Sequence, residues 1–141
     1  MTKNPLKNKK IFIAGHKGMV GSALVNFFKK NEIKNLILIS KKKLDLLNEK
    51  KVHKFIAFHK PDIIINCAGK VGGILANSSF PIEFLHQNIM IQNNLVNGSF
   101  RNNIKHFINL GSSCIYPKNS KQPIKEEYLL SGYLEKTNEA Y

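Results

Sequence analysis

The sequence contains little of several features that would indicate a secreted, metal-binding or membrane protein. Its two cysteines, Cys67 and Cys114, have neither metal-ligand nor disulfide-framework spacing, which indicates reduced thiols in a cytoplasmic protein. No apolar run approaches the roughly 20 residues that cross a bilayer, so we expect no membrane-spanning helix. Residues 1–9 are basic and polar, which argues against a secretory signal and predicts a flexible tail.

Acidic residues are also few, nine against 22 lysines and arginines, and the net charge is +13. Such a charge attracts polyanions. However, Arg101 is the only arginine, and the lysines are scattered without an aromatic-laced basic stripe or a nucleic-acid-binding motif. We attribute the charge to a general bias toward lysine, asparagine and isoleucine, and expect no nucleic-acid partner. The five histidines have no ligand spacing, so we assign no metal.

What is present is the pattern of a single α/β domain. With 141 residues and 43% apolar content, the chain is long enough for one compact domain with one core. Short apolar runs alternate with segments of helical spacing, which predicts a doubly wound, Rossmann-like parallel sheet covered on both faces. We expect this domain to span residues 10–141 and its sheet to stop after about the fifth strand. The expected strands are 10–14, 36–39, 44–47, 62–66 and 106–110, and the expected helices are 19–30, 48–59 and 81–101.

Three residues mark the ends of the expected helices. Asn48 can cap the N-terminus of the second helix, and Pro61 prevents its continuation. Pro81 fits the first turn of the third helix, whose residues run to Arg101. Residues 117–136 are polar and are predicted to form a loop.

The strongest local motif is Gly15-His16-Lys17-Gly18-Met19-Val20-Gly21, a G-x-x-G-x-x-G pattern between an expected buried strand and a helix. Glycines at such a turn allow a pyrophosphate to approach the backbone and the helix to pack closely on the strand. The helix N-terminus adds free N–H groups and a partial positive charge. In this context the motif predicts dinucleotide binding, the alternative being a glycine-rich turn without a ligand.

The residues after the second expected strand bear on the choice of cofactor. An NAD site usually has an acidic residue there, which binds the ribose 2′-hydroxyl. This chain has Ser40, followed by Lys41, Lys42 and Lys43. Ammonium groups attract a 2′-phosphate, so we predict NADP(H), with Lys41 as its main partner and help from Lys17. The alternative is a solvated lysine run in a lysine-rich protein.

At this point the chain resembles the extended short-chain dehydrogenase/reductases. Asn66-Cys67-Ala68-Gly69 follows one expected strand, Ser112 follows the last one, and Tyr141 comes later. Within that group the chain is similar to the GDP-L-fucose synthase family over most of its length. The segments that carry the similarity are Ile13 to Ser22, Lys70 to Ile74 with Ala76-Asn77 and Pro81, Leu110 to Pro117, Gln122-Pro123 with Glu126, and Thr137 to Tyr141, where Lys136 and Ala140 replace two prolines of the family.

This resemblance implies a reaction and a set of roles. The family epimerises GDP-4-dehydro-6-deoxy-D-mannose at two carbons and reduces its ketone with NADPH, as a homodimer. Tyr141 would protonate the C4 oxygen, Ser112 would hydrogen-bond it, and Cys114 would be the epimerisation base. Lys70, Gly72 and Gly73 would bind the substrate. The residues assigned to the cofactor are Gly15, His16, Lys17, Gly18, Met19, Val20, Gly21, Lys41, Lys42, Lys43, Leu44, Asp45, Leu46, Leu110, Gly111, Ser112 and Ser113.

Other interpretations stay open from the sequence. Ser112 could only cap a turn, Cys114 could be a small buried apolar group, and Lys70 could lie on an exposed loop. The protein could be another nucleotide-sugar epimerase or reductase, or a non-catalytic dinucleotide-binding module. Because the sequence stops at Tyr141, before the lysine and histidine that the family uses, we expect an N-terminal fragment that is inactive alone.

Overall fold

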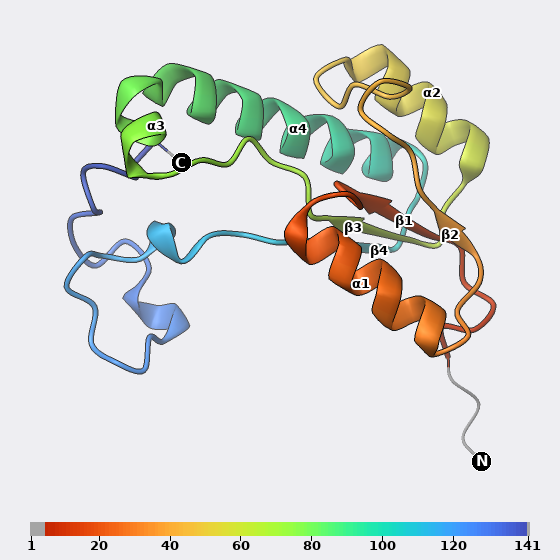
Figure 1. Cartoon of the computed structure of the whole chain (residues 1–141), viewed down its shortest axis with the longest axis horizontal. Helices are drawn as coiled ribbons and strands as arrows, with labels where there is room; N and C mark the ends of the chain where they lie inside the picture. Colours follow the sequence, from red (N-terminus) through yellow and green to blue (C-terminus); the bar gives the residue numbers. More distant parts are fainter. Residues whose placement is uncertain (1–4, 141) are drawn as a thin grey trace. The chain divides into compact units, whose positions relative to one another are not determined.

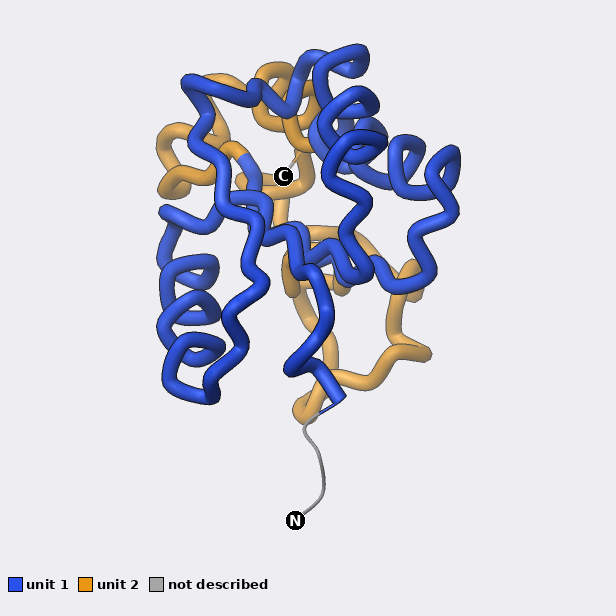
Figure 2. Tube along the Cα trace, turned by 90° about the vertical axis from the view of Figure 1, so that its right-hand side faces the viewer, with its two compact units in different colours: residues 1–69, 89–110 blue, residues 70–88, 111–141 orange. Residues whose placement is uncertain are grey.

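The structure is a computed structural model that describes residues 5–140 (Figure 1). It consists of two compact units, coloured separately in Figure 2. Unit 1 comprises residues 1–69 and 89–110, and unit 2 comprises residues 70–88 and 111–141, as far as each is described. Of the tail expected at residues 1–9, positions 1–4 lie outside the described residues, and residues 5–8 form a turn.

Unit 1 is built on a four-stranded parallel sheet in the order β2-β1-β3-β4 (Figure 1). The strands are β1 (Ile11–Ala14), β2 (Leu36–Ile37), β3 (Ile63–Asn66) and β4 (His106–Asn109). Ala14 is paired with Asn66, and Asn66 with Asn109, so the three longer strands end in register. The loops that follow these strands therefore leave the sheet from one edge, where ligands bind in open α/β sheets.

Helices pack on both faces of the sheet, since successive side chains of a strand point to opposite faces. Ile11 and Ile13 of β1 pack with α1 (Met19–Lys30), whose Val25 and Phe28 are buried. Phe12 and Ala14 pack on the other face with α2 (Glu49–His59) and with Leu95 of α4 (Pro81–Arg101). The predicted doubly wound α/β class is thereby confirmed.

The expected helix boundaries are confirmed as well. Helix α1 covers the predicted residues, and α4 begins at Pro81 and ends at Arg101. The Asn48 side chain caps α2 by accepting the Lys51 N–H at 2.9 Å. No helix of the described chain is both long enough and apolar enough to pass through a membrane.

The strand predicted at residues 44–47 is wrong, because this segment forms a turn. The Leu44 N–H donates to the Ser40 carbonyl, and the Asp45 carboxylate accepts the Leu47 N–H at 3.1 Å. The Leu44 side chain is buried in the core on the α2 side of the sheet, which accounts for its apolar character without a strand. β2 is also shorter than expected, and β4 is largely exposed rather than buried.

Unit 2 contains less regular structure. Its elements are α3 (Ile74–Ser79), the first turns of α4, and two 3-10 turns, η1 (Ser113–Ile115) and η2 (Glu126–Tyr128). α3 was not predicted, since it is a single short helix whose N-cap residue, Gly73, provides no capping side chain. The other described residues of this unit form loops and turns, as the polar composition of residues 117–136 suggested.

Candidate functional site

The glycine loop of unit 1 has the geometry that its sequence predicted. Gly15 has a φ of +75°, and a Cβ on it would lie 2.7 Å from the backbone of Cys67 and Ala68. A Cβ on Gly21 would overlap the Gly15 carbonyl and lie 2.8 Å from the His16 Cα. Two of the three glycines are therefore required sterically, and the loop lies close to the carboxyl ends of β1 and β3. This close backbone packing fits a pyrophosphate-binding turn.

Helix α1 begins directly at this loop. Its N-cap, Gly18, is extended and has no side chain that could occupy the N–H groups of the first turn. That turn contains no acidic residue, whereas Lys29 and Lys30 lie in the last turn and complement the negative end of the helix dipole. Partial burial and the neighbouring Lys17 lower the pKa of His16. The positive charge at this loop therefore comes from the uncapped N–H groups of the first turn of α1, and it suits an anionic group.

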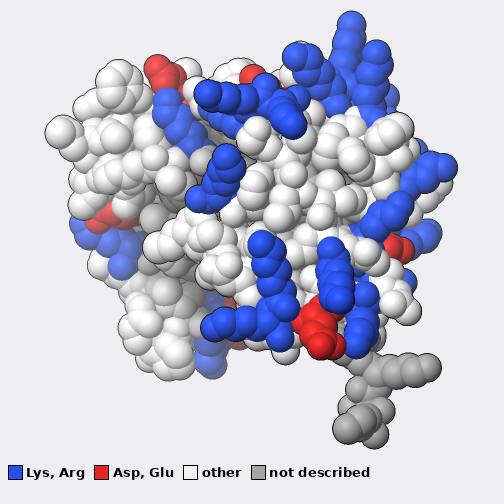
Figure 3. Space-filling model, turned by 45° about the vertical axis from the view of Figure 1, so that its right-hand side comes forward, with Lys and Arg blue, Asp and Glu red and all other residues white. Residues whose placement is uncertain are grey.

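The segment after β2 carries positive charge at the surface of unit 1. Lys41, Lys42 and Lys43 are exposed, and no carboxylate of the described residues forms an ion pair with them. The loop that follows is held by Asn94, whose Nδ2 donates to the Leu46 carbonyl at 2.8 Å. The segment after β2 thus presents three ammonium groups that no carboxylate of the described residues neutralises. Figure 3 shows lysine and arginine side chains spread over the face drawn, with uncharged surface between many of them.

Cys67 lies beside the glycine loop but has a packing role. Its N–H donates to the Ala14 carbonyl at 3.0 Å, and its side chain packs against the core on the α1 side of the sheet. Burial raises the pKa of the Cys67 thiol, so its reactive thiolate form is disfavoured. Residues 5–140 contain no group of three or more His, Cys, Asp and Glu side chains that could hold a metal.

Ser112 and Cys114 lie in one turn of unit 2. The Ser112 Oγ caps η1 by accepting the Cys114 N–H at 3.1 Å, and the Tyr116 N–H donates to the Ser113 carbonyl. The capping alternative for Ser112 is therefore observed. It is compatible with catalysis, because a hydroxyl that accepts one hydrogen bond still has its own proton to donate. Tyr141, the expected proton donor, lies outside the described residues.

Lys70 is held by its surroundings in unit 2 rather than freely solvated. Asn88 binds its backbone twice, accepting the N–H at 2.6 Å and donating to the carbonyl at 3.0 Å. The Lys70 ammonium pairs with the Glu83 carboxylate and lies 5.2 Å from the centre of the Phe84 ring. A Cβ on Gly72 would lie 2.9 Å from the same ring, whereas Gly73 faces open space.

Glu83 and Asn88 were missed by sequence reasoning. Both lie on α4, 13 and 18 residues after Lys70. The sequence offered two polar residues in an expected helix, and nothing in their spacing indicates that they hold an earlier loop. The one sequence signal for these contacts is proximity, since α4 follows the Lys70–Gly73 segment and the short helix α3 along the chain.

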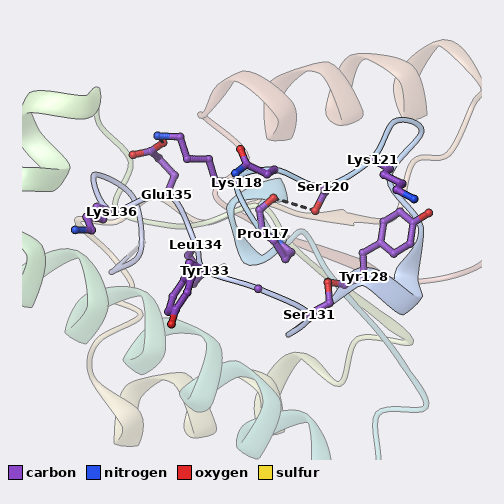
Figure 4. Close-up of a pocket in the computed structure, with 12 residues that line it drawn as sticks. Pro117, Lys118, Ser120, Lys121, Tyr128, Ser131, Tyr133, Leu134, Glu135 and Lys136 are labelled. Carbon is purple, nitrogen blue, oxygen red and sulfur yellow. Dashed lines mark hydrogen bonds and ion pairs between the residues drawn. The ribbon is translucent and has the colours of Figure 1, made fainter.

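A hollow of about 880 Å³ lies within the loops of unit 2 (Figure 4). Lys118 and Glu135 form an ion pair of 2.6 Å at its wall, and the hydrogen bond from Lys118 lowers the pKa of the Glu135 carboxyl. The Lys118 N–H also donates to the Tyr133 carbonyl at 3.0 Å. The sequence indicated only a polar loop here. The hollow is lined by Pro117, Lys118, Asn119, Ser120, Lys121, Tyr128, Ser131, Gly132, Tyr133, Leu134, Glu135 and Lys136.

Comparison with known proteins gives consistent matches. The model of the NAD dependent epimerase/dehydratase family matches residues 11–141. The chain is 48% identical to a GDP-L-fucose synthase of Sinorhizobium fredii and 43% identical to that of Escherichia coli, over 96% of its length in both cases. It is 44% identical to a Campylobacter jejuni GDP-mannoheptose C4 reductase solved with NADP bound, with a TM-score of 0.88 over 93% of the chain.

These matches confirm the resemblance derived from the motifs. The chain spans 43% and 42% of the length of the two curated relatives, and 41% of the solved reductase. The glycine loop, Lys70 and the Ser112–Cys114 turn all fall within the matched residues.

Proposed function

Because the chain belongs to the NAD dependent epimerase/dehydratase family, we propose that it binds NADP(H) and takes part, within the complete protein, in converting GDP-4-dehydro-6-deoxy-D-mannose to GDP-L-fucose. The reaction combines 3,5-epimerisation with reduction of the C4 ketone. The observation that carries the proposal is the turn after β4 that places Ser112 and Cys114 together. A hydroxyl donor and a thiol base in one turn suit a ketone and the acidic carbons beside it.

The glycine loop supports the cofactor part of this proposal. Gly15 and Gly21 allow a pyrophosphate to approach the backbone at the N-terminus of α1. Lys41, with Lys42 and Lys43 beside it, would bind the 2′-phosphate. NADPH, when bound, supplies the hydride for the ketone. The Campylobacter reductase solved with NADP is in line with this choice of cofactor.

The remaining chemistry is assigned to the chain's own residues. Cys114 would be the base that removes protons from the carbons beside the ketone, a task suited to a thiolate, and it would work with a histidine that the family carries later in its chain. The Ser112 hydroxyl would donate to the ketone oxygen while its Oγ accepts the Cys114 N–H. Tyr141 would protonate the same oxygen, a role that rests on the resemblance alone.

The decisive experiment replaces Cys114 by serine in the protein expressed from its complete gene. We expect epimerisation to fall by about 100-fold or more, because a hydroxyl is a far weaker base, while ketone reduction continues. Product analysis by NMR would then find a reduced, unepimerised sugar. Cys67→Ser is the matched control and should keep both activities, since the Cys67 thiol packs beside the core.

The same experiment tests a second candidate, a GDP-sugar C4 reductase that performs no epimerisation. The similarity to the GDP-mannoheptose C4 reductase favours this candidate. A pure reductase would yield unepimerised product before and after the Cys114→Ser change. That result would contradict the fucose-forming reaction and leave the ketone-reducing role of Ser112 in place.

A second prediction concerns the cofactor. Lys41→Ala should weaken NADPH binding about tenfold, equivalent to about 1.4 kcal/mol, and leave NADH binding unchanged. The reason is that only NADPH carries the 2′-phosphate that the ammonium would neutralise. Calorimetry with both nucleotides measures the difference. Lys30→Ala, at the opposite end of α1 from the loop, is the control, and equal affinity of the unaltered protein for both nucleotides would refute the assignment.

We further propose that two copies of the complete protein associate through α4. Five apolar side chains with large exposed areas recur on one side of this helix at helical spacing. They are Ile82, Leu85, Ile89, Val96 and Phe100. A single helix that presents such a stripe can pack against the same helix of a second copy related by two-fold symmetry.

A further inference from the structure

Asn77 is the one buried residue of α3, with 7% of its surface exposed. Its apolar neighbours Ile74 and Leu75 are 64% and 79% exposed, so this helix buries an amide and exposes hydrocarbon. Burying an amide costs free energy unless it forms hydrogen bonds. The partners of Asn77 should therefore explain why it is buried.

Those partners come from two separate segments of unit 2. The Asn77 Nδ2 donates to the Asn138 Oδ1 at 3.1 Å, across 61 residues of sequence, and makes a longer contact of 3.5 Å with the Gly72 carbonyl. Asn138 is itself fixed in a turn, because its N–H donates to the Glu135 carbonyl at 2.9 Å. One amide group thus joins the Lys70–Gly73 loop to the turn that contains Asn138.

Both segments carry candidate functional residues. Gly72 belongs to the loop assigned to the substrate, and Asn138 immediately precedes the Glu139-Ala140-Tyr141 end of the sequence. We propose that Asn77 is a positioning residue, whose hydrogen bond to Asn138 holds residues 138–140, which directly precede the Tyr141 proton donor in the sequence, against the substrate loop. This inference rests on the proposed function, which assigns Tyr141 and the loop their roles.

The Lys70–Gly73 loop is itself held in place by hydrogen bonds and by packing. Asn88 binds the Lys70 backbone at both its N–H and its carbonyl, and Gly72 is confined by the Phe84 ring and the Ala76 methyl group. The Asn77 Oδ1 is buried and has no partner among the described residues, so Nδ2 makes the hydrogen bonds of this side chain. Loss of Asn138 would leave the buried amide with only its long contact to Gly72.

The inference predicts a defect in turnover rather than in cofactor binding. Misplacing a reacting group by about 1 Å can cost about 100-fold in rate. Asn77→Ala and Asn138→Ala should each lower kcat by about 10- to 100-fold. NADPH affinity should stay within about twofold, because the glycine loop and Lys41–Lys43 belong to unit 1.

The test uses these two variants and their double variant in the complete protein. Since both residues act through one hydrogen bond, the double variant should be no slower than either single variant. Asn138→Asp keeps an acceptor for the Asn77 Nδ2 and should restore most of the rate. Ser78→Ala, an exposed neighbour on α3, is the control. The solvent deuterium isotope effect on ketone reduction should increase in the slow variants, because proton donation becomes limiting.

A second readout does not depend on turnover. Hydrogen exchange of backbone amides in residues 134–140 should accelerate in Asn77→Ala, while exchange in α1 stays unchanged. Unchanged exchange in residues 134–140 would overturn the inference, as would a kcat within twofold of the unaltered protein or additive effects in the double variant. If the unaltered protein fails to reduce the GDP-keto-sugar, the proposed function fails, and the exchange result still decides whether Asn77 holds this segment.

Discussion

Individual glycines of this chain differ in what a side chain would meet. A Cβ on Gly15 or Gly21 would collide with backbone atoms, which cannot move aside without shifting a strand or a helix. A Cβ on Gly73 meets nothing within 4 Å, and its φ of −76° is ordinary for any residue. The glycine loop therefore depends on the absence of side chains, because the helix must approach the loop closely.

This difference gives a prediction at the residue scale. Gly21→Ala should lower the free energy of unfolding by about 2 kcal/mol or more, because the methyl group overlaps the Gly15 carbonyl. Gly73→Ala should change it by less than about 0.5 kcal/mol. Urea denaturation followed by circular dichroism measures both variants. Equal stability of the two variants would show that α1 does not pack on the loop as described.

Among the helices, α2 shows how local signals define an element. It begins at the Asn48 cap and buries Val52 and Ile56. It ends where Lys60 adopts a left-handed conformation, with its N–H donating to the Ile56 carbonyl at 2.8 Å. Pro61 follows and cannot continue a helix. Each of these features is local in sequence, which is why the boundaries of α2 could be predicted.

At the scale of this element, the cap has a measurable effect. Asn48→Ala should destabilise the protein by about 1 kcal/mol, because the Lys51 N–H loses its acceptor. Asn48→Asp keeps an acceptor and adds a favourable charge at the helix N-terminus, so it should be close to the unaltered protein. Thermal unfolding of both variants tests this. A loss of the same size in Asn48→Asp would argue against a capping role.

For the whole molecule, the apolar stripe on α4 leads to a prediction about assembly. Ile89→Glu combined with Val96→Glu should convert a dimer of the complete protein to a monomer, because the charges would be buried in the interface. Analytical ultracentrifugation measures the change. Phe58→Glu is the matched control, since Phe58 is 82% exposed on α2 and lies outside the stripe. A monomeric unaltered protein would contradict the proposed association.

The sequence by itself determined the elements that depend on neighbouring residues. Apolar periodicity located α1, α2 and α4, and the runs that became β1 and β3 alternate with them in the order of a parallel sheet. The G-x-x-G-x-x-G spacing located the loop, and the motifs around Lys70 and Ser112 identified the family. These signals can be recognised in the sequence because the spacings of helices and strands repeat over a few residues.

Only the tertiary structure decided which distant residues meet. It decided that residues 44–47 form a turn rather than a strand. Leu44 is buried beneath α2 and α4, and this burial accounts for its apolar character as well as a strand would. It paired Asn66 with Asn109 across 43 residues and Asn77 with Asn138 across 61. It also attached Lys70 to Glu83 and Asn88 of α4. Amides and charges that pair through space have no periodic signature in the chain, because their geometry arises only when the elements pack.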